Sequence, residues 1–369
     1  MMKVLFAAGG TGGHIFPAIS IADELRKKVS DTEILFVGAK DRIEEKIVPH
    51  NGYKLETIRL TGFDREKFFK NAGLPFKIVG SLRKCFLILK KFKPDVVIGT
   101  GGFVCGPLVY AAGIMRIPTV IQEGNEYPGK TIKFLAPRSD LVIINFDGTR
   151  KYLRTKAEIM KISHPIRKNL VLTDKKDAVE IFGLNANLKT LFVFGGSQGA
   201  RGINQAIEEI TEKLYDDNIN LIWQAGQNDA ERLSEKFRSK SDKIKILKFI
   251  DNMSAAYSAC NLIVCRAGIT SIMEIAYLKI PAILIPLPTS AENHQELNAR
   301  SVEKANGVEV ILQKDLNDKL YLKIKMLMND EKKLTDLSEN VSKFSDINAA
   351  SKIADKIINI FKINERKNL

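Results

Sequence analysis

The sequence predicts an α/β fold of two similar lobes, each organised around a parallel β-sheet. Short, wholly apolar runs alternate along the chain with amphipathic helical patterns, and this alternation is typical of parallel sheets. A cycle of strand, glycine-rich turn and helix opens at residue 4 and starts again near residue 190. The chain has 369 residues, which is too long for one ordinary core. We therefore expect a first lobe over 1–164 and a second over 165–345.

Several predicted strands of the first lobe run into glycines or polar residues, as strands do at the ligand-binding edge of an open sheet. From Asp346 onward, apolar residues at helical spacing predict one long amphipathic helix, which we expect to cross back and complete this lobe. The predicted strands are 4–8, 33–39, 95–103, 120–125 and 140–145, and the predicted helices begin at Pro17 and cover 40–49, 80–92 and 107–115.

The second lobe repeats the pattern after a break at 163–167 that resembles a domain linker. Each of its predicted strands is followed by a polar or glycine-bearing turn. These strands are 191–194, 221–225, 244–249 and 262–265, and a further strand precedes Pro286.

The turn at 9–13 separates the first strand from its helix with four glycines and is followed by His14. Glycines allow the backbone to turn sharply and to approach a ligand closely. A helix that follows such a turn offers free N–H groups to an anion, and Pro17 suits a first helical turn because its missing N–H is unsatisfied there in any case. The alternative interpretation is a tight turn with a buried, satisfied histidine.

Composition indicates a globular protein with an acidic partner. The net charge is +14, which favours nucleic acid, a phosphorylated substrate or an anionic membrane as that partner. Four cysteines form neither a disulfide framework nor a zinc spacing, so we expect a reducing compartment, and no secretory signal opens the chain. The uncharged run 96–115 is long enough to span a bilayer, but glycines and Pro107 interrupt it, so we expect strand, loop and helix instead.

The stretch 64–93 is strongly basic and carries interleaved aromatic residues. We expect 80–92 to be a core helix with a solvated basic face. For the loop 66–79 we favour contact with an anionic membrane surface, because aromatic residues beside lysines suit a lipid interface.

The glycine turns exclude several common nucleotide sites. Residues 10–15 lack the third glycine of a dinucleotide fingerprint, and 195–199 have the wrong spacing for one. The chain contains no P-loop motif and no Asp-x-Asp, and its four histidines have no paired ligand spacing. We therefore expect neither a metal site nor a cofactor. The remaining interpretation is a set of turns at strand ends, suited to a diphosphate and facing one another across a cleft between the lobes.

The second lobe adds a helix that opens at Gly268 and carries Ser271 and Glu274 in its first turns. The Glu274 carboxylate could interact with the helix dipole alone. It could also accept both hydroxyls of a ribose while the helix N-terminus holds phosphates.

Five ordered motifs together resemble the MurG family of glycosyltransferases of peptidoglycan synthesis, over essentially the whole chain. The resemblance implies the GT-B architecture of two Rossmann-like lobes. It also implies inverting transfer of N-acetylglucosamine from UDP-GlcNAc to the C4 hydroxyl of the muramoyl sugar of lipid I, giving lipid II, at the cytoplasmic face of the bacterial membrane. The motifs are Gly9-Gly-Thr-Gly-Gly-His14, Gly101-Gly-Phe-Val-Cys-Gly106-Pro107, Gly195-Gly-Ser-Gln-Gly-Ala200-Arg201, Phe249-Ile-Asp-Asn-Met253 and the Gly268…Glu274 helix.

The resemblance also implies roles for particular residues. His14 is the candidate general base, because imidazole suits proton removal near neutral pH. Phe249 and Ile250 would border the uracil, Ser197 and the 268–271 helix start would hold the diphosphate, and Glu274 would hold the ribose. The implied nucleotide-sugar contacts are Thr11, Gly12, Gly13, Asn125, Arg167, Ser197, Ile250, Ile269, Thr270, Ser271, Ile272, Met273, Glu274 and Gln295. Gly10, Gly102 and Phe103 would receive the acceptor diphosphate.

This chain departs from the family pattern at three places. Cys105 stands where a small hydroxyl residue is common, and His294 stands where a glutamine is common. The family usually has His-Glu-Gln-Asn where this chain has Gln122-Glu-Gly-Asn125, so contacts near the acceptor are in doubt there. Three other functions remain open: a glycosyltransferase acting on diacylglycerol, a UDP-sugar sensor without activity, and a basic nucleic-acid-binding protein. The last rests on charge alone, because no recognition helix or aromatic–basic sheet motif is visible.

Overall fold

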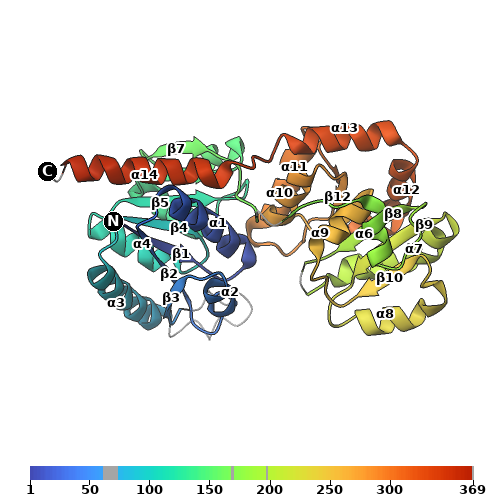
Figure 1. The fold of residues 1–369 in the computed structure, drawn as a ribbon, viewed down its shortest axis with the longest axis horizontal. Coiled ribbons are helices and arrows are strands. Elements are labelled where there is room, and N and C mark those ends of the chain that lie inside the picture. Colours follow the sequence, from blue (N-terminus) through green and yellow to red (C-terminus); the bar gives the residue numbers. More distant parts are fainter. Residues whose placement is uncertain (61–73, 168–169, 197, 368–369) are drawn as a thin grey trace. The chain divides into compact units, whose positions relative to one another are not determined.

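The computed structural model describes residues 1–60, 74–167, 170–196 and 198–367, and for 74–78 and 361–367 it describes the backbone. The chain divides into two compact units (Figure 1). Unit 1 consists of Met1–Arg167 and Asp346–Leu369, and unit 2 of Lys168–Ser345. The sequence predicts the boundary between 164 and 165, close to this division. The two lobes, each with a parallel sheet, are confirmed.

Unit 1 contains a seven-stranded sheet in the order β3-β2-β1-β4-β5-β6-β7, and every pairing between its strands is parallel. The elements of this unit are β1 Met2–Ala8, α1 Gly12–Lys28, β2 Thr32–Ala39, α2 Glu44–His50, β3 Lys54–Ile58, α3 Leu74–Phe92, β4 Val96–Gly101, α4 Cys105–Ile114, β5 Thr119–Glu123, α5 Lys130–Leu135, β6 Leu141–Ile144, β7 Glu158–Lys161 and α14 Ala349–Lys367, with 3₁₀ helices at Ala136–Arg138 and Asp147–Tyr152.

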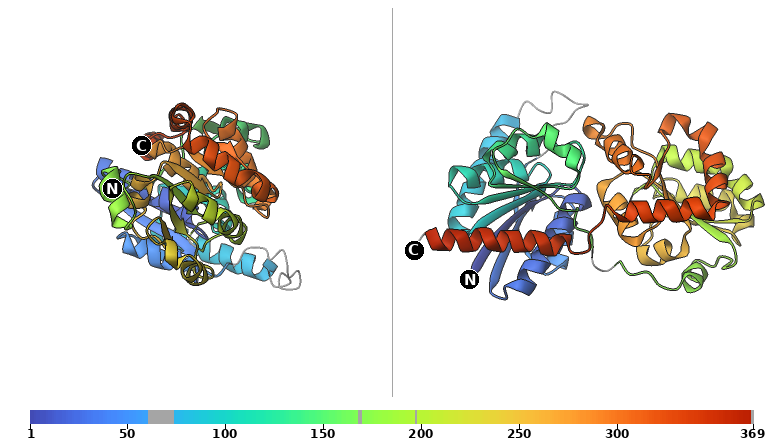
Figure 2. Two further views of the ribbon diagram at one scale, coloured as in Figure 1. Left: turned by 90° about the vertical axis from the view of Figure 1, so that its right-hand side faces the viewer. Right: turned by 90° about the horizontal axis from the view of Figure 1, so that it is seen from above.

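The core of unit 1 lies on both faces of this sheet. Val4 and Phe6 of β1 face a layer that contains α1 and α14, whereas Leu5 of the same strand faces α3 and α4. The C-terminal helix α14 packs against α1 and contributes Ile353 to that core, so the predicted return of this helix to the first lobe is confirmed (Figure 2). The predicted core face of the 80–92 helix is also confirmed, since its apolar residues pack in the α3–α4 layer.

The four helices predicted between residues 17 and 115 all begin at other residues than the sequence predicts; α3 begins at Leu74 and α4 at Cys105, and for α1 and α2 the backbone gives the reason. Helix α1 begins at Gly12, because Thr11 has extended backbone and the turn closes earlier, so Pro17 lies inside the helix and removes one of its hydrogen bonds. Helix α2 begins at Glu44 and not at Lys40, because Asp41 has a left-handed backbone (φ 60°) that a helix cannot contain.

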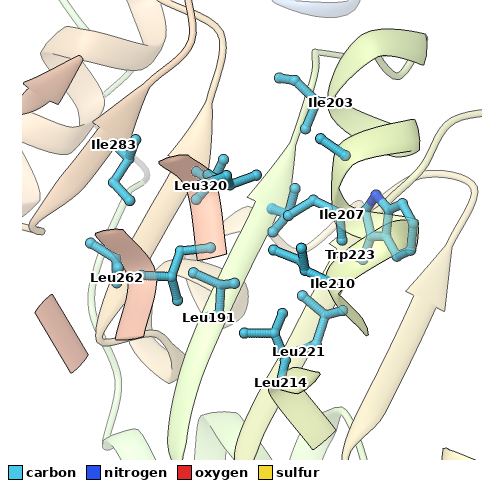
Figure 3. Packing of buried hydrophobic residues seen from close by; sticks show 14 of the residues in the cluster. Leu191, Ile203, Ile207, Ile210, Leu214, Leu221, Trp223, Leu262, Ile283 and Leu320 are labelled. Carbon is cyan, nitrogen blue, oxygen red and sulfur yellow. The ribbon is translucent and has the colours of Figure 1, made fainter. Parts of the chain in front are cut away.

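Unit 2 contains a six-stranded parallel sheet in the order β10-β9-β8-β11-β12-β13. Trp223 of β9 is fully buried in the core on one face of this sheet, among residues of α7 and α12 (Figure 3). The elements of this unit are α6 Lys175–Ile181, β8 Lys189–Phe194, α7 Arg201–Asp216, β9 Ile219–Gln224, α8 Ala230–Lys236, β10 Ile244–Leu247, α9 Met253–Ala259, β11 Leu262–Cys265, α10 Ile269–Leu278, β12 Ala282–Leu284, α11 His294–Glu303, β13 Glu309–Val310, α12 Leu316–Met328 and α13 Glu331–Ser342, with 3₁₀ helices at Arg238–Lys240, Ala291–Asn293 and Gln313–Asp315.

In each sheet, successive strands are first added toward one edge and then toward the other. The place between the two strands where this order reverses is the switch point of the sheet. In unit 1 this point lies between β1 and β4, and in unit 2 between β8 and β11. Open parallel sheets bind ligands at the carboxyl ends of the two strands that flank such a point. The turn after β1 leads directly into the first turn of α1, which carries His14, and the turn after β4 carries Gly102. The turns after β8 and β11 carry Gly196 and Gly268. The topology therefore places the predicted glycine turns where each sheet is suited to hold a ligand.

Candidate active site

His14 lies in the first turn of α1, at the carboxyl end of β1. Its Nδ1 atom is 3.1 Å from the Gly9 carbonyl oxygen and 3.3 Å from the Thr11 hydroxyl oxygen. Because a carbonyl oxygen only accepts, the Gly9 contact is a hydrogen bond when Nδ1 carries the proton. The lone pair of the neutral imidazole is then on Nε2. This is the tautomer that a general base needs.

The turns after β1 and β4 contact one another so closely that only glycine fits. A Cβ atom on Gly102 would lie 2.2 Å from the Gly9 carbonyl oxygen, and a Cβ atom on Gly101 would lie 2.4 Å from the His14 ring. Gly102 has a φ of +82°, which favours glycine independently of space. The Thr100 hydroxyl donates to the His14 carbonyl oxygen over 2.7 Å. These contacts hold the His14 ring against β4.

Phe103 and Asn125 lie in this part of unit 1 as well. The Phe103 ring borders Gly10, where a Cβ atom would be 3.6 Å from it. Asn125 donates both its backbone N–H and its side-chain amide to Glu123 Oε1, each over 2.9 Å. Burial raises the pKa of Glu123, and the N–H groups of Asn125 and Gly129 oppose that rise. Arg167 lies over the Phe16 ring, 5.0 Å from its centre, and belongs to unit 1.

A buried polar cluster follows β5, β6 and β7, and the sequence did not indicate it. Gln122 Nε2 lies 3.3 Å from His164 Nδ1, and the His164 backbone N–H donates to Asn145 Oδ1 over 2.8 Å. Burial and, to a smaller extent, the charge of His14 together lower the pKa of His164 to about 3, so His164 is neutral near pH 7. The family pattern usually has a histidine at position 122, where this chain has Gln122. In this chain an imidazole still lies at that position, because His164 contacts the Gln122 side chain.

Unit 2 holds a cavity of about 500 Å³ at its switch point. The N-termini of α7 and α10 both reach it, and Arg201 and Arg266 contribute positive charge. Helix N-termini and arginines together suit a diphosphate. Of the predicted residues, Ser271 and Gln295 line this cavity. The full lining is Gly195, Gly196, Gly199, Ala200, Arg201, Gly202, Arg266, Gly268, Ser271, Leu287, Pro288, Thr289, Gln295 and Gln313.

Arg266 is fixed in the wall of the cavity. Its guanidinium donates to the carbonyl oxygens of Ile285 and Pro286 and, over 2.6 Å, to Gln313 Oε1. Sequence reasoning missed Arg266 and Arg201 as site residues, although Arg201 ends one quoted motif and Arg266 stands two residues before another. The signal that could have found them is their position at, or a few residues before, the start of a helix that follows a predicted strand.

Other predicted donor contacts lie deeper in unit 2. The side chains of Ile272 and Met273 are fully buried in α10, and Ile269 and Glu274 are buried too, so of this segment only Thr270 and Ser271 are partly exposed. Tyr257 donates to Glu274 Oε2 over 2.8 Å.

The backbone N–H of Ile250 has a protein partner already. It donates to Gln224 Oε1 over 2.8 Å, and Gln224 Nε2 donates in turn to the Gly196 carbonyl oxygen. If the uracil base contacts the backbone of Ile250, the group available for a hydrogen bond is therefore the Ile250 carbonyl and not its N–H. Ser197 lies outside the described residues.

Two general properties of the described part of the chain bear on the site. No group of three or more His, Cys, Asp or Glu side chains there could hold a metal ion. None of the described helices is both long enough and apolar enough to cross a membrane.

The comparisons with known proteins cover both units. Residues 4–144 match the N-terminal domain of glycosyltransferase family 28, and residues 190–356 match the C-terminal domain of the same family. The transferases that follow are named UDP-N-acetylglucosamine–N-acetylmuramyl-(pentapeptide) pyrophosphoryl-undecaprenol N-acetylglucosamine transferase. That of Flavobacterium psychrophilum is 39% identical over 360 residues, covering 97% of each chain. That of a Thermoanaerobacter species is 40% identical over 357 residues, covering 95% of this chain and 98% of the relative.

A solved structure agrees with these relatives. The crystal structure of MurG from Acinetobacter baumannii superposes with a TM-score of 0.78 at 25% identity, covering 97% of this chain and all of that one. Fold and domains define a glycosyltransferase of family 28 with two Rossmann-like lobes. Within that class, the chain belongs to the MurG family of UDP-N-acetylglucosamine–N-acetylmuramyl-(pentapeptide) pyrophosphoryl-undecaprenol N-acetylglucosamine transferases.

Proposed function

We propose that this protein transfers N-acetylglucosamine from UDP-GlcNAc to the C4 hydroxyl of the muramoyl sugar of lipid I, forming lipid II with inversion. The observation that carries the proposal is the His14 ring at the switch point of unit 1, with Nδ1 3.1 Å from the Gly9 carbonyl oxygen. When Nδ1 donates to this carbonyl, the lone pair is on Nε2. Family membership supplies the substrate class.

The donor is assigned to unit 2. A cavity of about 500 Å³ with two helix N-termini, Arg201 and Arg266 supports a nucleoside diphosphate there. Ser271 and Gln295 line the cavity, so we assign them to the diphosphate and the sugar hydroxyls. Glu274 would bind the ribose hydroxyls through its carboxylate, whose Oε2 accepts a hydrogen bond from the Tyr257 hydroxyl.

The acceptor is assigned to unit 1. The turns at 9–13 and 101–103, whose glycines let a ligand approach the backbone closely, would receive the lipid-linked diphosphate. The N–H groups of Gly10 and Gly101 already donate to Glu44 and Cys105, so the other N–H groups of these turns would make the contacts. We keep Asn125 and Arg167 as contacts to the substrates, on the strength of the resemblance alone.

The chemistry is a single displacement. The C4 hydroxyl oxygen attacks C1 of the N-acetylglucosamine, and its proton passes to His14 Nε2. The bond between C1 and the UDP oxygen breaks, and the electron pair leaves with UDP. The helix N-termini and arginines of unit 2 stabilise the developing charge on the diphosphate, and we propose that they do so without a metal ion.

We propose a peripheral position at the cytoplasmic face of the membrane. The described part of α3 exposes Val79 and Leu87, which are 67% and 59% accessible, beside the exposed cations Arg83, Lys84 and Lys90. Apolar side chains among cations suit an anionic lipid surface. The loop residues 64–73 that the sequence assigns to the same surface lie outside the described residues.

The test is transfer of radiolabelled N-acetylglucosamine from UDP-GlcNAc to a short-chain lipid I analogue, with EDTA present and with His14→Gln alongside. We expect transfer by the unaltered protein in EDTA and a loss of kcat of at least a hundredfold in His14→Gln. No transfer to this acceptor, with UDP-GlcNAc binding intact by calorimetry and transfer to diacylglycerol in its place, would overturn the proposal.

A further inference from the structure

Glu44 is a fully buried carboxylate at the first turn of α2, beside the ends of β1 and β2. Its Oε1 accepts the Ala39 backbone N–H over 2.9 Å. Its two oxygens also accept the Gly10 backbone N–H, over 3.3 and 3.2 Å. A carboxylate without solvent and with several backbone donors is held in one place.

The surrounding backbone is shaped to admit this side chain. A Cβ atom on Gly9 would lie 2.5 Å from Glu44 Oε1, and a Cβ atom on Gly38 would lie 2.6 Å from Glu44 Cγ. Both glycines have negative φ, so their backbone conformation does not require glycine. What requires glycine at these positions is the space that the Glu44 side chain occupies.

The peptide group between Gly9 and Gly10 links Glu44 to His14. Its N–H, from Gly10, donates to Glu44, and its carbonyl oxygen, from Gly9, lies 3.1 Å from His14 Nδ1 and accepts from it when that nitrogen carries the proton. Hydrogen bonds in a chain polarise one another in a low-dielectric interior. A negative charge on the N–H side of a peptide group therefore strengthens the carbonyl on the other side as an acceptor.

We propose that Glu44 is the positioning residue of His14, acting through the Gly9–Gly10 peptide group. It holds the proton on Nδ1, fixes the plane of the ring, and stabilises the imidazolium that forms when Nε2 takes the acceptor proton. No proton reaches Glu44, because the peptide group stands between. The inference rests on the proposed role of His14 as base, and it assigns to Glu44 and one peptide group the task that a carboxylate performs directly in a catalytic triad.

Other titratable groups face His14 and must be counted. His164 lies close enough for its pKa to respond to the charge on His14, and it is neutral near pH 7. The Cys105 thiol donates to the carbonyl of Gly101, the residue against the ring, and burial raises the pKa of this thiol to about 12. The charge of the buried Glu123 contributes to the rise in the Cys105 pKa, so Glu123 belongs to this set as well. The Glu44 carboxylate accepts from the peptide group that contacts the His14 ring, and replacing it by a neutral side chain should lower the pKa of His14.

The test compares the unaltered protein with Glu44→Gln, which keeps the shape of the side chain and removes its charge. Two-dimensional ¹H–¹⁵N spectra of histidine-labelled protein, assigned with His14→Gln, report the tautomer and the titration of His14 directly. We expect the proton on Nδ1 in the unaltered protein. In Glu44→Gln we expect the His14 pKa and the acidic limb of the kcat/KM profile to move to lower pH by at least about half a unit. We also expect kcat to fall about tenfold with the KM for UDP-GlcNAc unchanged.

Asp95→Asn is the matched control. Like Glu44, Asp95 accepts a backbone N–H, in its case from Lys3 of β1 over 2.6 Å, at the end of this strand opposite to Gly10. This variant should leave the His14 titration and the pH profile unmoved, whereas a merely structural role of Glu44 would lower activity without shifting either.

Two results would overturn the inference. One is a neutral His14 that carries its proton on Nε2 in the unaltered protein, which needs no variant to be observed. The other is a His14 titration that Glu44→Gln leaves in place. If instead His14→Gln keeps full activity, the proposed base is wrong, and the spectra still decide whether Glu44 controls the ring.

Discussion

The hydroxyl of Tyr257 donates to Glu274 Oε2 over 2.8 Å, and both side chains are buried. Tyr257 comes from α9 and Glu274 from α10, so the bond joins two helices of unit 2. A carboxylate with a buried partner on one oxygen has a structural role beside any role in binding. Both roles can be measured separately.

Replacing Glu274 by alanine should weaken the protein and its donor binding together. The Tyr257 hydroxyl would lose a buried acceptor, which costs about 1–3 kcal/mol in the free energy of unfolding. The KM for UDP-GlcNAc should rise. Glu274→Gln retains an acceptor for Tyr257 and is the control, so its stability should stay nearer to that of the unaltered protein. A donor KM that is unchanged in Glu274→Ala would end the assignment of the ribose to this residue.

Replacing Arg201 by glutamine should raise the KM for UDP-GlcNAc about tenfold, since an exposed cation at the diphosphate cavity is lost. The melting temperature should hardly change. Arg238, an exposed cation remote from this cavity's lining, supplies the control Arg238→Gln. Equal donor KM values in the two variants would argue against the cavity as the diphosphate site.

Replacing Gly102 by alanine should displace the Gly9 carbonyl and with it the His14 ring. Gly52 is the matched control, because it also has positive φ (+76°) but nothing within 4 Å of its missing Cβ. Gly52→Ala costs the backbone strain alone, about 1–2 kcal/mol. Gly102→Ala should cost about 1–3 kcal/mol more through steric overlap, measured by urea unfolding, and should lower kcat. Similar losses of stability in both variants would contradict the close contact.

His164 predicts a pH dependence of stability. Its pKa is lowered to about 3 in the folded protein, whereas the unfolded chain keeps the ordinary value near 6.5. Between these values the unfolded state binds the extra proton, so this residue makes stability fall as pH falls from about 6.5 toward 3, by up to about 1.4 kcal/mol per pH unit. The loss is absent above pH 6.5.

The measurement is urea unfolding of the unaltered protein and of His164→Asn at several values between pH 4 and 7. The difference between the two removes the contributions of other groups, such as Glu208, whose pKa is lowered to about 2 by the Arg232 and Lys236 hydrogen bonds. A difference that stays constant with pH would show that His164 titrates normally.

The apolar residues of α3 predict membrane attachment. Replacing Val79 and Leu87 by serine should reduce co-sedimentation with anionic vesicles at low salt, and Phe68→Ser, Phe69→Ser and Phe76→Ser should act in the same direction. Leu322, 65% exposed on α12 of unit 2, supplies the control Leu322→Ser. If the α3 variants and the control bind vesicles equally, the surface lies elsewhere.

The strands that could be predicted from sequence are those with long buried runs, such as Val4–Ala8 and Leu191–Phe194. The strands β3, β7 and β13 were missed, and all three lie at sheet edges, where a half-exposed strand needs no apolar run. The glycine turns and His14 could be predicted because their residues are contiguous in the sequence and directly follow a predicted strand.

Glu44 could not be found in this way. It stands in a charged segment that is typical of an exposed helix. Its burial depends on the nearby Gly38 and on Gly9, which is distant in sequence and adjacent in space. The same holds for His164 and Gln122, whose contact joins two strand ends. Contacts of this kind require the fold.

The return of α14 to unit 1 has a consequence for biosynthesis. Ile353 and Ile357 of this helix belong to the core that also contains Val4 and Phe6 of β1. The ribosome synthesises β1 long before α14. The core of unit 1 therefore cannot be completed until the whole of unit 2 has been synthesised. Unit 2 is a continuous segment with its own core and can fold while it emerges. The second lobe should therefore reach its native packing before the first, and a nascent chain truncated at residue 345 should resist proteolysis in unit 2 alone.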